Sequence, residues 1–461
     1  MRARTLLKTA ASVAAVAALT TGCLASGDEE PSGDSTSGSG SGSGSGSEGG
    51  SPGAGGSEPG DGVVEVFGAF GAAEQEAFEE ALVAFEEDSG IDIQYTGNAD
   101  FTTFIRSRVQ GGDPPDIALF PQPGLLLDIA SDGETLVPID EFLERDVLDE
   151  TLIPGFLEAT TDADGTTWGA PMRMAVKSLV WVPKPAFTDA GYPLEYASLQ
   201  ELMTTAETIR DDGTAPWCIG YESGAATGWV GTDWLEEMVL RTAGPDVYDQ
   251  WVSHEIPFND PQIAAALDAY GEIVFGDGLV AGGANAIITT PFGTTFNAAF
   301  EEPPGCYMMR NGNFSTGFFP ENVQADLDGT VDVFVLPPSE GGYDGQPILG
   351  GGDLAGLLNG EDDEAKEVMA FLTADTFGAE WAQAGGWLSP HATFDATNYP
   401  DETTKTIAEL VANADVFRFD ASDLMPAEVG AGTFWTGMVE WTTGDKTTDE
   451  VLTEIEESWP E

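Results

Sequence analysis

The chain has 461 residues, with 16 Lys and Arg against 80 Asp and Glu, so its formal net charge is −64. A surface this negative repels the phosphate backbone of nucleic acids, which excludes a nucleic-acid-binding protein. Hydrophobic residues make up 41% of the chain and aromatic residues 10%, which is enough material for a core. We therefore expect an acidic globular protein, and its length favours two domains.

The N-terminus has the features of an export signal. Three cations within the first eight residues precede an apolar stretch at 9–20, which is too short to span a bilayer. Residues 19–23 resemble a bacterial lipobox, in which the cysteine is lipidated and becomes the first residue. We predict a signal peptide over 1–22 and a lipid on Cys23. An ordinary secretory signal with a chance cysteine is the alternative.

The next segment has the composition of a flexible tether. Residues 24–60 contain 13 Gly and 11 Ser, including an alternating Ser-Gly run at 37–47. Such a sequence cannot form a core, and as a coil it spans roughly 30 to 37 Å. We predict that 23–60 is a lipidated, disordered tether. It would anchor a folded part, 61–461, to the outer face of the cell membrane.

Cysteine usage agrees with export. If Cys23 carries lipid, Cys218 and Cys306 remain as an even pair in an oxidising compartment. We predict one disulfide between them, with two free buried thiols as the alternative. Only His254 and His391 are available as further zinc ligands, so we expect no metal site.

The start of the folded part alternates short apolar strands with helices. This order predicts a mostly parallel, helix-flanked sheet of an α/β protein. Ligands of such sheets bind at the carboxyl ends of the strands, here the loops 68–71 and 120–124. The predicted elements are a strand at 63–67, a helix ending at Gly90, a strand at 91–95, a helix at 101–109 and a strand at 116–120.

The rest of the chain continues this pattern with more helix. Asp162 to Gly165 superficially resembles the start of a calcium loop, but the remaining ligand spacing is missing, so we interpret it as a turn. The predicted elements are a hairpin turn at Asp164-Gly165, a strand at 179–182, a helix that Asp260 caps and Pro261 begins, a strand at 331–336 and a helix at 365–377.

Four sequence stretches carry a family resemblance: GGDPPDIALFPQPGLL, PWCIGYESGAATGWVGTDWLEE, YDQWVSHEIPFNDP and GGGDLAGLL. They are similar to the extracellular solute-binding proteins of carbohydrate ABC importers, particularly the α-glucoside-binding branch, over essentially 61–461. The resemblance implies a two-lobe, periplasmic-binding-protein-like (type II) α/β fold with hinge crossings and closure around a sugar. We assign 61–172 plus about 335–378 to lobe 1 and 173–334 plus about 379–461 to lobe 2.

A neutral sugar needs flat aromatic faces for its C–H surfaces and charged or amide groups for its hydroxyls. Trp229, Trp387 and Trp435 each stand beside glycine or another small residue, and Phe70 lies in a glycine-flanked loop. Large aromatic residues in such loops are awkward core residues, so we predict that they face the sugar. Ordinary packing is the alternative for any single one.

The resemblance adds further candidates. It implies that Phe120 and Gln122 contact the sugar from the first lobe and that Trp435 is an aromatic platform of the second lobe. It also implies contact roles for Glu222 and Phe314.

Four charged residues complete the candidate site. The maltose-binding branch of the resembled family has an acidic residue near the first crossing. This chain has Arg173 and Lys177 there, and this departure leaves the identity of the sugar open. Arg173 is suited to binding two hydroxyls, with a salt bridge as the alternative. Asp233 and Asp353 follow glycine-containing stretches and would accept sugar hydroxyls, or would cap helices instead.

Enzyme motifs are weak in this sequence. Neither histidine stands in a nucleophile-elbow context, and no GxxxxGK[ST] loop marks a transporter ATPase. We therefore predict a non-enzymatic binding component that captures an α-glucoside or similar oligosaccharide and delivers it to a membrane permease. We expect a monomer without cofactor. A secreted, tethered glycosidase or polysaccharide lyase is one alternative, and a structural or adhesive surface module is another.

Overall fold

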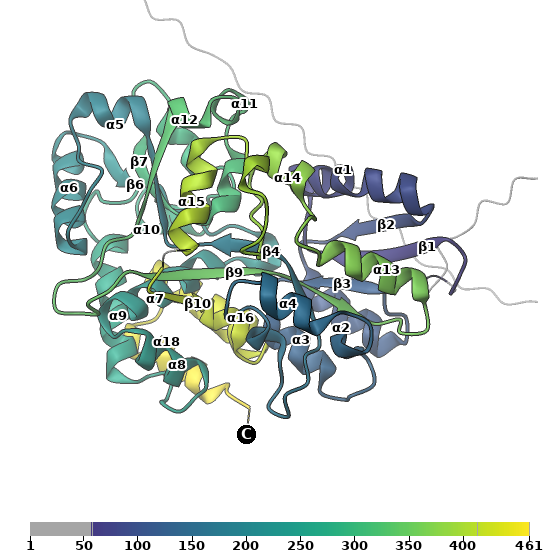
Figure 1. The fold of residues 1–461 in the computed structure, drawn as a ribbon. Helices are drawn as coiled ribbons and strands as arrows, with labels where there is room; N and C mark the ends of the chain where they lie inside the picture. Colours follow the sequence, from purple (N-terminus) through teal and green to yellow (C-terminus); the bar gives the residue numbers. More distant parts are fainter. Residues whose placement is uncertain (1–56, 58, 413, 461) are drawn as a thin grey trace, which may run out of the picture. The chain divides into compact units, whose positions relative to one another are not determined.

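The structure is a computed structural model of the chain and describes residues 57, 59–412 and 414–460. These described residues belong to one compact unit (Figure 1). The predicted signal peptide, Cys23 and nearly all of the predicted tether lie outside the described residues. Every helix within the described part is too short or too polar to cross a membrane.

The first sheet begins with the predicted alternation of strands and helices. Strand β1 pairs in parallel with both β2 and β3, as expected for helical crossovers. Gly90 caps the first helix, and its N–H donates to the carbonyl of Glu86. The elements are β1 (Val63–Gly68), α1 (Ala72–Ser89), β2 (Asp92–Gly97), α2 (Phe101–Gly111) and β3 (Ile117–Phe120).

A long strand, β9 (Pro347–Leu357), makes this sheet mixed rather than parallel. It runs antiparallel to β3 and to β4 (Ala170–Val176), and parallel to β10 (Val416–Phe419). In the register of β4 and β9, Arg173 lies directly opposite Asp353. The pairing of two strands far apart in the sequence thus places these two charges side by side.

The second sheet has four strands and lies on the other side of two chain crossings. The chain leaves the first sheet after β4, through Lys177 and Ser178, and returns between β8 (Val331–Val335) and β9. Ser178 joins both crossings, because its carbonyl accepts the N–H of Leu336 and its hydroxyl oxygen accepts the N–H of Leu349, each at 2.8 Å. The strand order is β6 (Ala215–Trp217), β7 (Cys306–Arg310), β5 (Leu179–Pro183) and β8 (Val331–Val335).

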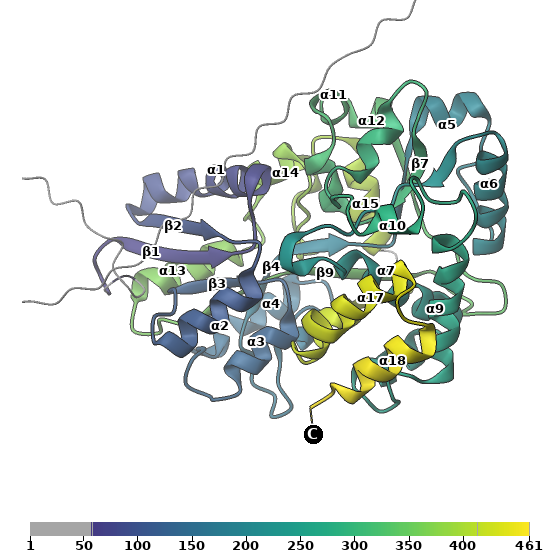
Figure 2. The same ribbon diagram turned by 180° about the vertical axis from the view of Figure 1, so that it is seen from behind.

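The predicted lobe boundaries stay predictions, but the C-terminal part does not follow one sheet. Strand β10 belongs to the first sheet, although the sequence assigns 379–461 to the second lobe. Helices α17 (Trp435–Thr443) and α18 (Thr448–Glu457) pack instead against α7 (Trp229–Thr242) and α9 (Pro261–Val274), as Figure 2 shows. Residues 230–241 of α7 are all buried, so this helix is surrounded by protein.

Two local predictions can be compared directly with the structure. The side chain of Asp260 accepts the N–H of Gln262 at 2.8 Å, which confirms the predicted cap of α9. Helix α13 (Asp363–Leu372) is shorter than the predicted 365–377. The reason is that the carbonyl of Thr373 lies 3.1 Å from Nε2 of His391, while the N–H of Phe377 donates to Ala374.

The turn at Asp164-Gly165 is present, with Thr161 and Thr167 bridged across it. One carboxylate oxygen of Asp162 accepts the N–H groups of Asp164 and Thr166, and the other accepts the indole N–H of Trp168. Asp162 therefore closes the turn, in agreement with the turn interpretation of this motif.

The remaining helices cover the two sheets. They are α3 (Pro123–Ala130), α4 (Arg145–Thr151), α5 (Lys184–Ala190), α6 (Leu199–Asp211), α8 (Pro245–Val252), α10 (Ala284–Ile287), α11 (Glu321–Gln324), α12 (Leu327–Thr330), α14 (Ala379–Ala384), α15 (Glu402–Ala412) and α16 (Ala421–Leu424), with short 3-10 turns between some of them.

The predicted disulfide between Cys218 and Cys306 is confirmed. Cys218 follows β6 and Cys306 begins β7, so the bond joins two paired strands of the second sheet. Both cysteines are buried. Their sequence separation of 88 residues makes this a long covalent loop.

Replacing both cysteines with alanine should lower the free energy of unfolding by about 2 to 4 kcal/mol, because the unfolded chain would lose the constraint of this long loop. Urea denaturation with and without reductant measures the effect. Reductant should destabilise the natural protein and leave the double variant unchanged. Equal stability of the two proteins under oxidising conditions would contradict a stabilising role for the bond.

Candidate functional site

A cavity of about 460 Å³ lies where the loops after β1 and β3 face the start of α7 and of α17. Its volume falls in the range of about 300 to 1,000 Å³ that is usual for small-molecule sites. Ala69 and Gly71 line it from the first loop, and Pro121 and Gln122 from the second. Both loops predicted at the carboxyl ends of the strands therefore contribute to the cavity.

One side of the cavity is aromatic. Trp229 lies 5.2 Å from Phe292 and 6.0 Å from Phe314, measured between ring centres, and Phe292 lies 5.3 Å from Phe318. These four residues and Trp435 all line the cavity, and we call them the aromatic wall. Such a wall offers flat apolar faces to a ligand.

Close backbone packing places Trp435 in the aromatic wall. A Cβ atom on Gly228 would lie 2.2 Å from the carbonyl oxygen of Trp435, and Gly228 has a φ of 120°. A single π-helical turn, Val429–Phe434, immediately precedes Trp435. Such turns are frequent at functional sites, where they reorient a side chain.

Another part of the cavity lining is charged. Arg173 donates from Nε to Asp353 at 2.6 Å and from a terminal nitrogen to Glu74 of α1 at 2.8 Å. The guanidinium carbon lies 4.6 Å from the ring centre of Phe70 and 5.1 Å from that of Trp381. Two carboxylates and two rings thus fix the orientation of Arg173, which lines the cavity together with Glu74 and Asp353.

Lys177 forms a second buried ion cluster at the edge of the aromatic wall. Its ammonium nitrogen lies 3.2 Å from Asp233 of α7, hydrogen-bonds Asp420, and is 5.3 Å from the ring centre of Trp229. Burial raises the pKa of Asp233 to about 7, although Lys177 opposes this shift; the negative charge of Asp420 adds to it.

Behind this cluster the charges continue along α7. Glu237 pairs with Arg241 at 2.6 Å and with Arg310 at 3.1 Å, and it accepts the hydroxyl of Ser178 at 2.9 Å. All three charged side chains are fully buried. The ion network therefore reaches from the cavity to the crossing at Ser178.

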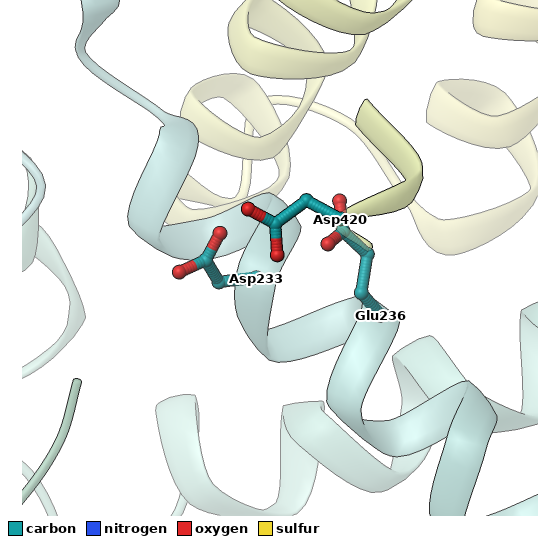
Figure 3. A group of neighbouring side chains, drawn as sticks. All are labelled: Asp233, Glu236 and Asp420. Atoms are coloured by element: carbon teal, nitrogen blue, oxygen red, sulfur yellow. The ribbon is translucent and has the colours of Figure 1, made fainter. Parts of the chain in front are cut away.

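Three of the acidic residues could by geometry hold a metal ion. Carboxylate oxygens of Asp233, Glu236 and Asp420 lie within 4.8 Å of one another (Figure 3). However, the ammonium group of Lys177 already contacts both Asp233 and Asp420 and supplies positive charge there. The arrangement is consistent with an ion cluster without metal, and the absence of a metal site stays a prediction.

Most of the predicted sugar-binding residues come together at this cavity. Asp233 and Asp353 are ion-paired inside α7 and β9, respectively, and cap no helix. Arg173 forms the salt bridges that the sequence left as its alternative, and it does so at the cavity surface. The predicted residues that line the cavity are Gln122, Arg173, Trp229, Asp233, Phe314, Asp353 and Trp435.

The structure does not bring Phe70, Phe120, Glu222 or Trp387 into the cavity lining. The three aromatic side chains are at most 2% exposed. Each packs in the core against other rings. Glu222 is exposed, and its carboxylate accepts the N–H of Gly224. A glycine neighbour does not tell whether a ring faces solvent or core, which explains the predictions for Phe70 and Trp387. Phe120 was predicted from the family resemblance, and its ring packs against Phe101.

Sequence reasoning missed several lining residues. Phe292 and Phe318 each stand beside glycine, the same signal that drew attention to the three tryptophans, so the sequence did mark them. Glu74 and Asp423 carried no such signal, because each is one acid among the 80 of this chain.

The raised pKa of Asp233 leads to a prediction about pH. The folded protein holds this proton up to about pH 7, whereas the unfolded chain releases it near pH 4. The proton on Asp233 therefore adds to the free energy of unfolding at low pH, and this contribution is lost as the pH rises towards 7. In Asp233→Asn this loss is absent, so the variant should gain stability relative to the natural protein between about pH 4 and 7, and no further above it.

Urea denaturation of both proteins from pH 4.5 to 8.5 measures this difference. The exposed Asp189 provides a matched control, since Asp189→Asn should follow the natural protein at every pH. A difference between Asp233→Asn and the natural protein that does not change with pH would contradict the assignment.

Comparison with known proteins agrees with this geometry. The family described as bacterial extracellular solute-binding protein matches residues 68–379. The chain is 44% identical over 397 residues to the osmoprotective compounds-binding protein GgtB of Synechocystis sp., covering 86% of this chain and 92% of that protein. It is 36% identical over 400 residues to the alpha-glucosides-binding periplasmic protein AglE of Rhizobium meliloti, covering 86% of each.

A solved structure supports the fold. Maltose-bound MalE3 of T. maritima superposes with a TM-score of 0.65 at 16% identity, covering 86% of this chain and 98% of that one. This likeness confirms the predicted two-lobe, type II α/β fold with hinge crossings. Together with the family match over more than half of the sequence, it confirms the resemblance drawn from the sequence motifs. The chain belongs to the bacterial extracellular solute-binding proteins.

Proposed function

We propose that this protein captures an α-glucoside or a similar oligosaccharide in the cavity and delivers it to the permease of a carbohydrate ABC importer. Membership of the family makes the chain an exported binding protein and not an enzyme. The observation that carries the proposal is that the aromatic wall and the two ion clusters around Arg173 and Lys177 line one cavity.

The two sides of the cavity match the two surfaces of a sugar. Ring faces such as that of Trp435 pack on sugar C–H groups, whereas carboxylates and the guanidinium hydrogen-bond to hydroxyls. Among the groups that would bind hydroxyls, Arg173 and its partners Glu74 and Asp353 already hold one another in place. A ligand therefore meets oriented donors and acceptors, which reduces the entropy cost of binding.

The relatives narrow the ligand class. The names of AglE and MalE3 specify alpha-glucosides and maltose, and the name of GgtB specifies osmoprotective compounds. AglE and GgtB are both similar in sequence to this chain over 86% of its length. We infer that an α-linked glucoside of two or three units is the ligand class for this chain.

Closure of the two lobes would present the ligand to the permease. Residues on both sides of the crossing at Ser178 line the cavity, so a ligand that contacts both sides favours the closed state by its differential affinity. We propose the lobe boundaries predicted from the sequence for this motion, with β10 moved to the first lobe.

We also propose that a lipid on Cys23 and the Gly/Ser-rich segment tether the protein to the outer face of the cell membrane, and that it acts as a monomer. The lipobox-like sequence and the composition of 24–60 support the tether. Metabolic labelling with a radioactive fatty acid should mark the natural protein and leave Cys23→Ser unlabelled.

The experiment that tests the function is thermal unfolding in the presence of α-glucosides and control sugars. A sugar present at 100 times its Kd should stabilise the protein by about 2.7 kcal/mol if it binds only the folded state. We expect a shift with one or two α-glucosides, and chromatography should recover the sugar intact. A panel that gives no shift, or a sugar that is recovered cleaved, would contradict the proposal.

Trp435→Ala should weaken binding of the sugar found in that screen by about 1 to 2 kcal/mol, as for loss of a large aromatic contact. Isothermal titration calorimetry measures the change in Kd. Trp387→Phe is the matched control, because Trp387 is buried outside the cavity and its loss should affect stability only. Unchanged affinity in Trp435→Ala would remove this residue from the site.

A further inference from the structure

The loop that joins β1 to α1 carries several parts of the candidate site. Ala69 and Gly71 line the cavity, and Glu74 follows in the first turn of α1. The ring of Phe70, between the two lining residues, lies against the guanidinium group of Arg173, with 4.6 Å between the guanidinium carbon and the ring centre. The position of this loop therefore decides where Arg173 and Glu74 stand in the cavity.

One side-chain hydroxyl holds the backbone of this loop. The N–H of Phe70 donates to the hydroxyl oxygen of Tyr95 at 2.8 Å, and this hydroxyl donates to the carbonyl oxygen of Phe70 at 3.1 Å. Tyr95 belongs to β2 and lies outside the cavity lining, and its ring stacks on that of Phe70 with 5.9 Å between the ring centres. Burial raises the pKa of Tyr95, so the hydroxyl keeps its proton and remains a donor. A single hydroxyl thus pairs both backbone polar groups of the residue that supports Arg173.

Two glycines make room for this contact. A Cβ atom on Gly68 would lie 2.8 Å from the hydroxyl oxygen of Tyr95, and one on Gly97 would lie 1.9 Å from the carbonyl oxygen of Phe70. A larger residue at either position would displace the tyrosine or the loop. The ends of β1 and β2 are therefore shaped to bring the hydroxyl of Tyr95 onto the backbone of Phe70.

The end of the loop is strained and has no cap of its own. Ala72, the first residue of α1, has a φ of 49°, in the left-handed region that a residue with a Cβ atom adopts at an energetic cost. Gly71, at the N-cap position, offers the helix no side-chain cap. The loop conformation thus depends on contacts from outside the loop and helix, and the two hydrogen bonds to Tyr95 are such contacts.

A second ring extends the support for Arg173. Trp381 of α14 lies 5.1 Å from the guanidinium carbon and packs edge-on against Phe70, with 5.2 Å between the ring centres. Helix α14 itself packs on α1 (Figure 1). A displacement of Phe70 would therefore disturb both rings that hold Arg173 in place.

We propose, on the basis of the proposed function, that Tyr95 is a positioning residue of the sugar site. Its hydroxyl fixes the loop that supports Arg173 and leads into Glu74, although Tyr95 itself lies outside the cavity lining. A single oxygen atom away from the ligand then contributes to the affinity for the sugar.

Tyr95→Phe tests the proposal, because it removes this one oxygen atom and keeps the ring. The N–H and the carbonyl of Phe70 lose their partner, so part of the protein population should hold Arg173 away from its binding position. We expect the affinity for the sugar found in the thermal screen to fall about three- to tenfold, as measured by isothermal titration calorimetry. An affinity equal to that of the natural protein would overturn the proposal and leave the proposed function intact.

Tyr270→Phe is the matched control. Tyr270 of α9 is fully buried, and its hydroxyl forms a hydrogen bond of 2.6 Å with the hydroxyl of Tyr221, outside the cavity lining. Both variants lose one buried hydroxyl, and urea denaturation should show that both are folded with lowered stability. Only Tyr95→Phe should lose affinity. An equal loss in Tyr270→Phe would assign the effect to general destabilisation and overturn the proposal.

A double-mutant cycle tests whether Tyr95 acts through Arg173. Arg173→Lys keeps the positive charge but loses the forked geometry of the guanidinium group. If Tyr95 acts by orienting that group, the two substitutions together should weaken binding by less than the product of their separate fold losses. Losses that multiply fully would show two independent effects and overturn the proposal.

A readout without sugar separates this proposal from the proposed function. NMR spectroscopy of the free protein follows the exchange with water of the Nε–H of Arg173, which donates to Asp353 at 2.6 Å and is identified by its absence in Arg173→Lys. This proton should exchange at least about threefold faster in Tyr95→Phe and at the natural rate in Tyr270→Phe. If no sugar binds the natural protein, the proposed function fails, and this rate still decides the role of Tyr95. An unchanged rate in Tyr95→Phe would overturn that role.

Discussion

Two buried cations on one short segment hold the functional part of this protein together. Arg173 and Lys177 stand four residues apart, in the middle of β4 and just after its end, where the chain crosses between the sheets. Arg173 pairs with carboxylates of α1 and β9, and Lys177 with those of α7 and of the residue before α16. A buried charge without partners would be strongly destabilising, so these pairs fix four separate elements around one cavity.

The same arrangement prepares the cavity for a ligand without net charge. A sugar hydroxyl can donate to Glu74 or Asp353 and accept from Arg173 without breaking the pairs that hold them, because each group has further lone pairs or N–H bonds. The aromatic wall supplies apolar area in the same cavity. Since the ion pairs are formed before the ligand arrives, binding requires little reorganisation of the charged side chains.

Local patterns in the sequence predicted the parts of the fold that depend on local chemistry. The alternation of strands and helices from Val63 to Phe120 and the cap at Asp260 are of this kind. The disulfide joins residues 88 apart and was predicted from the even number of remaining cysteines. Two features depended on residues far away in the chain. Strand β9 makes the sheet mixed by pairing with β3 and β4, and His391 ends α13 early by binding the carbonyl of Thr373.

The residues of the candidate site also divide into those that a local sequence pattern indicated and those that only tertiary contacts decide. Trp229 and Trp435 reach the cavity, whereas Trp387 has similar neighbours in the sequence and packs in the core. The difference lies in tertiary contacts: the close approach of Gly228 to Trp435 in one case, and packing between Phe377 and Phe394 in the other. Glu74 became recognisable only through its contact with Arg173, which lies 99 residues away.

The most direct test of the central claim is a crystal structure of the protein with the α-glucoside that gives the largest thermal stabilisation. The account predicts an intact sugar in the cavity, with a ring face on Trp229 or Trp435 and hydroxyls within hydrogen-bond distance of Arg173, Glu74 or Asp353. A sugar bound elsewhere on the protein, or one that contacts only the aromatic wall and none of these charged groups, would contradict it.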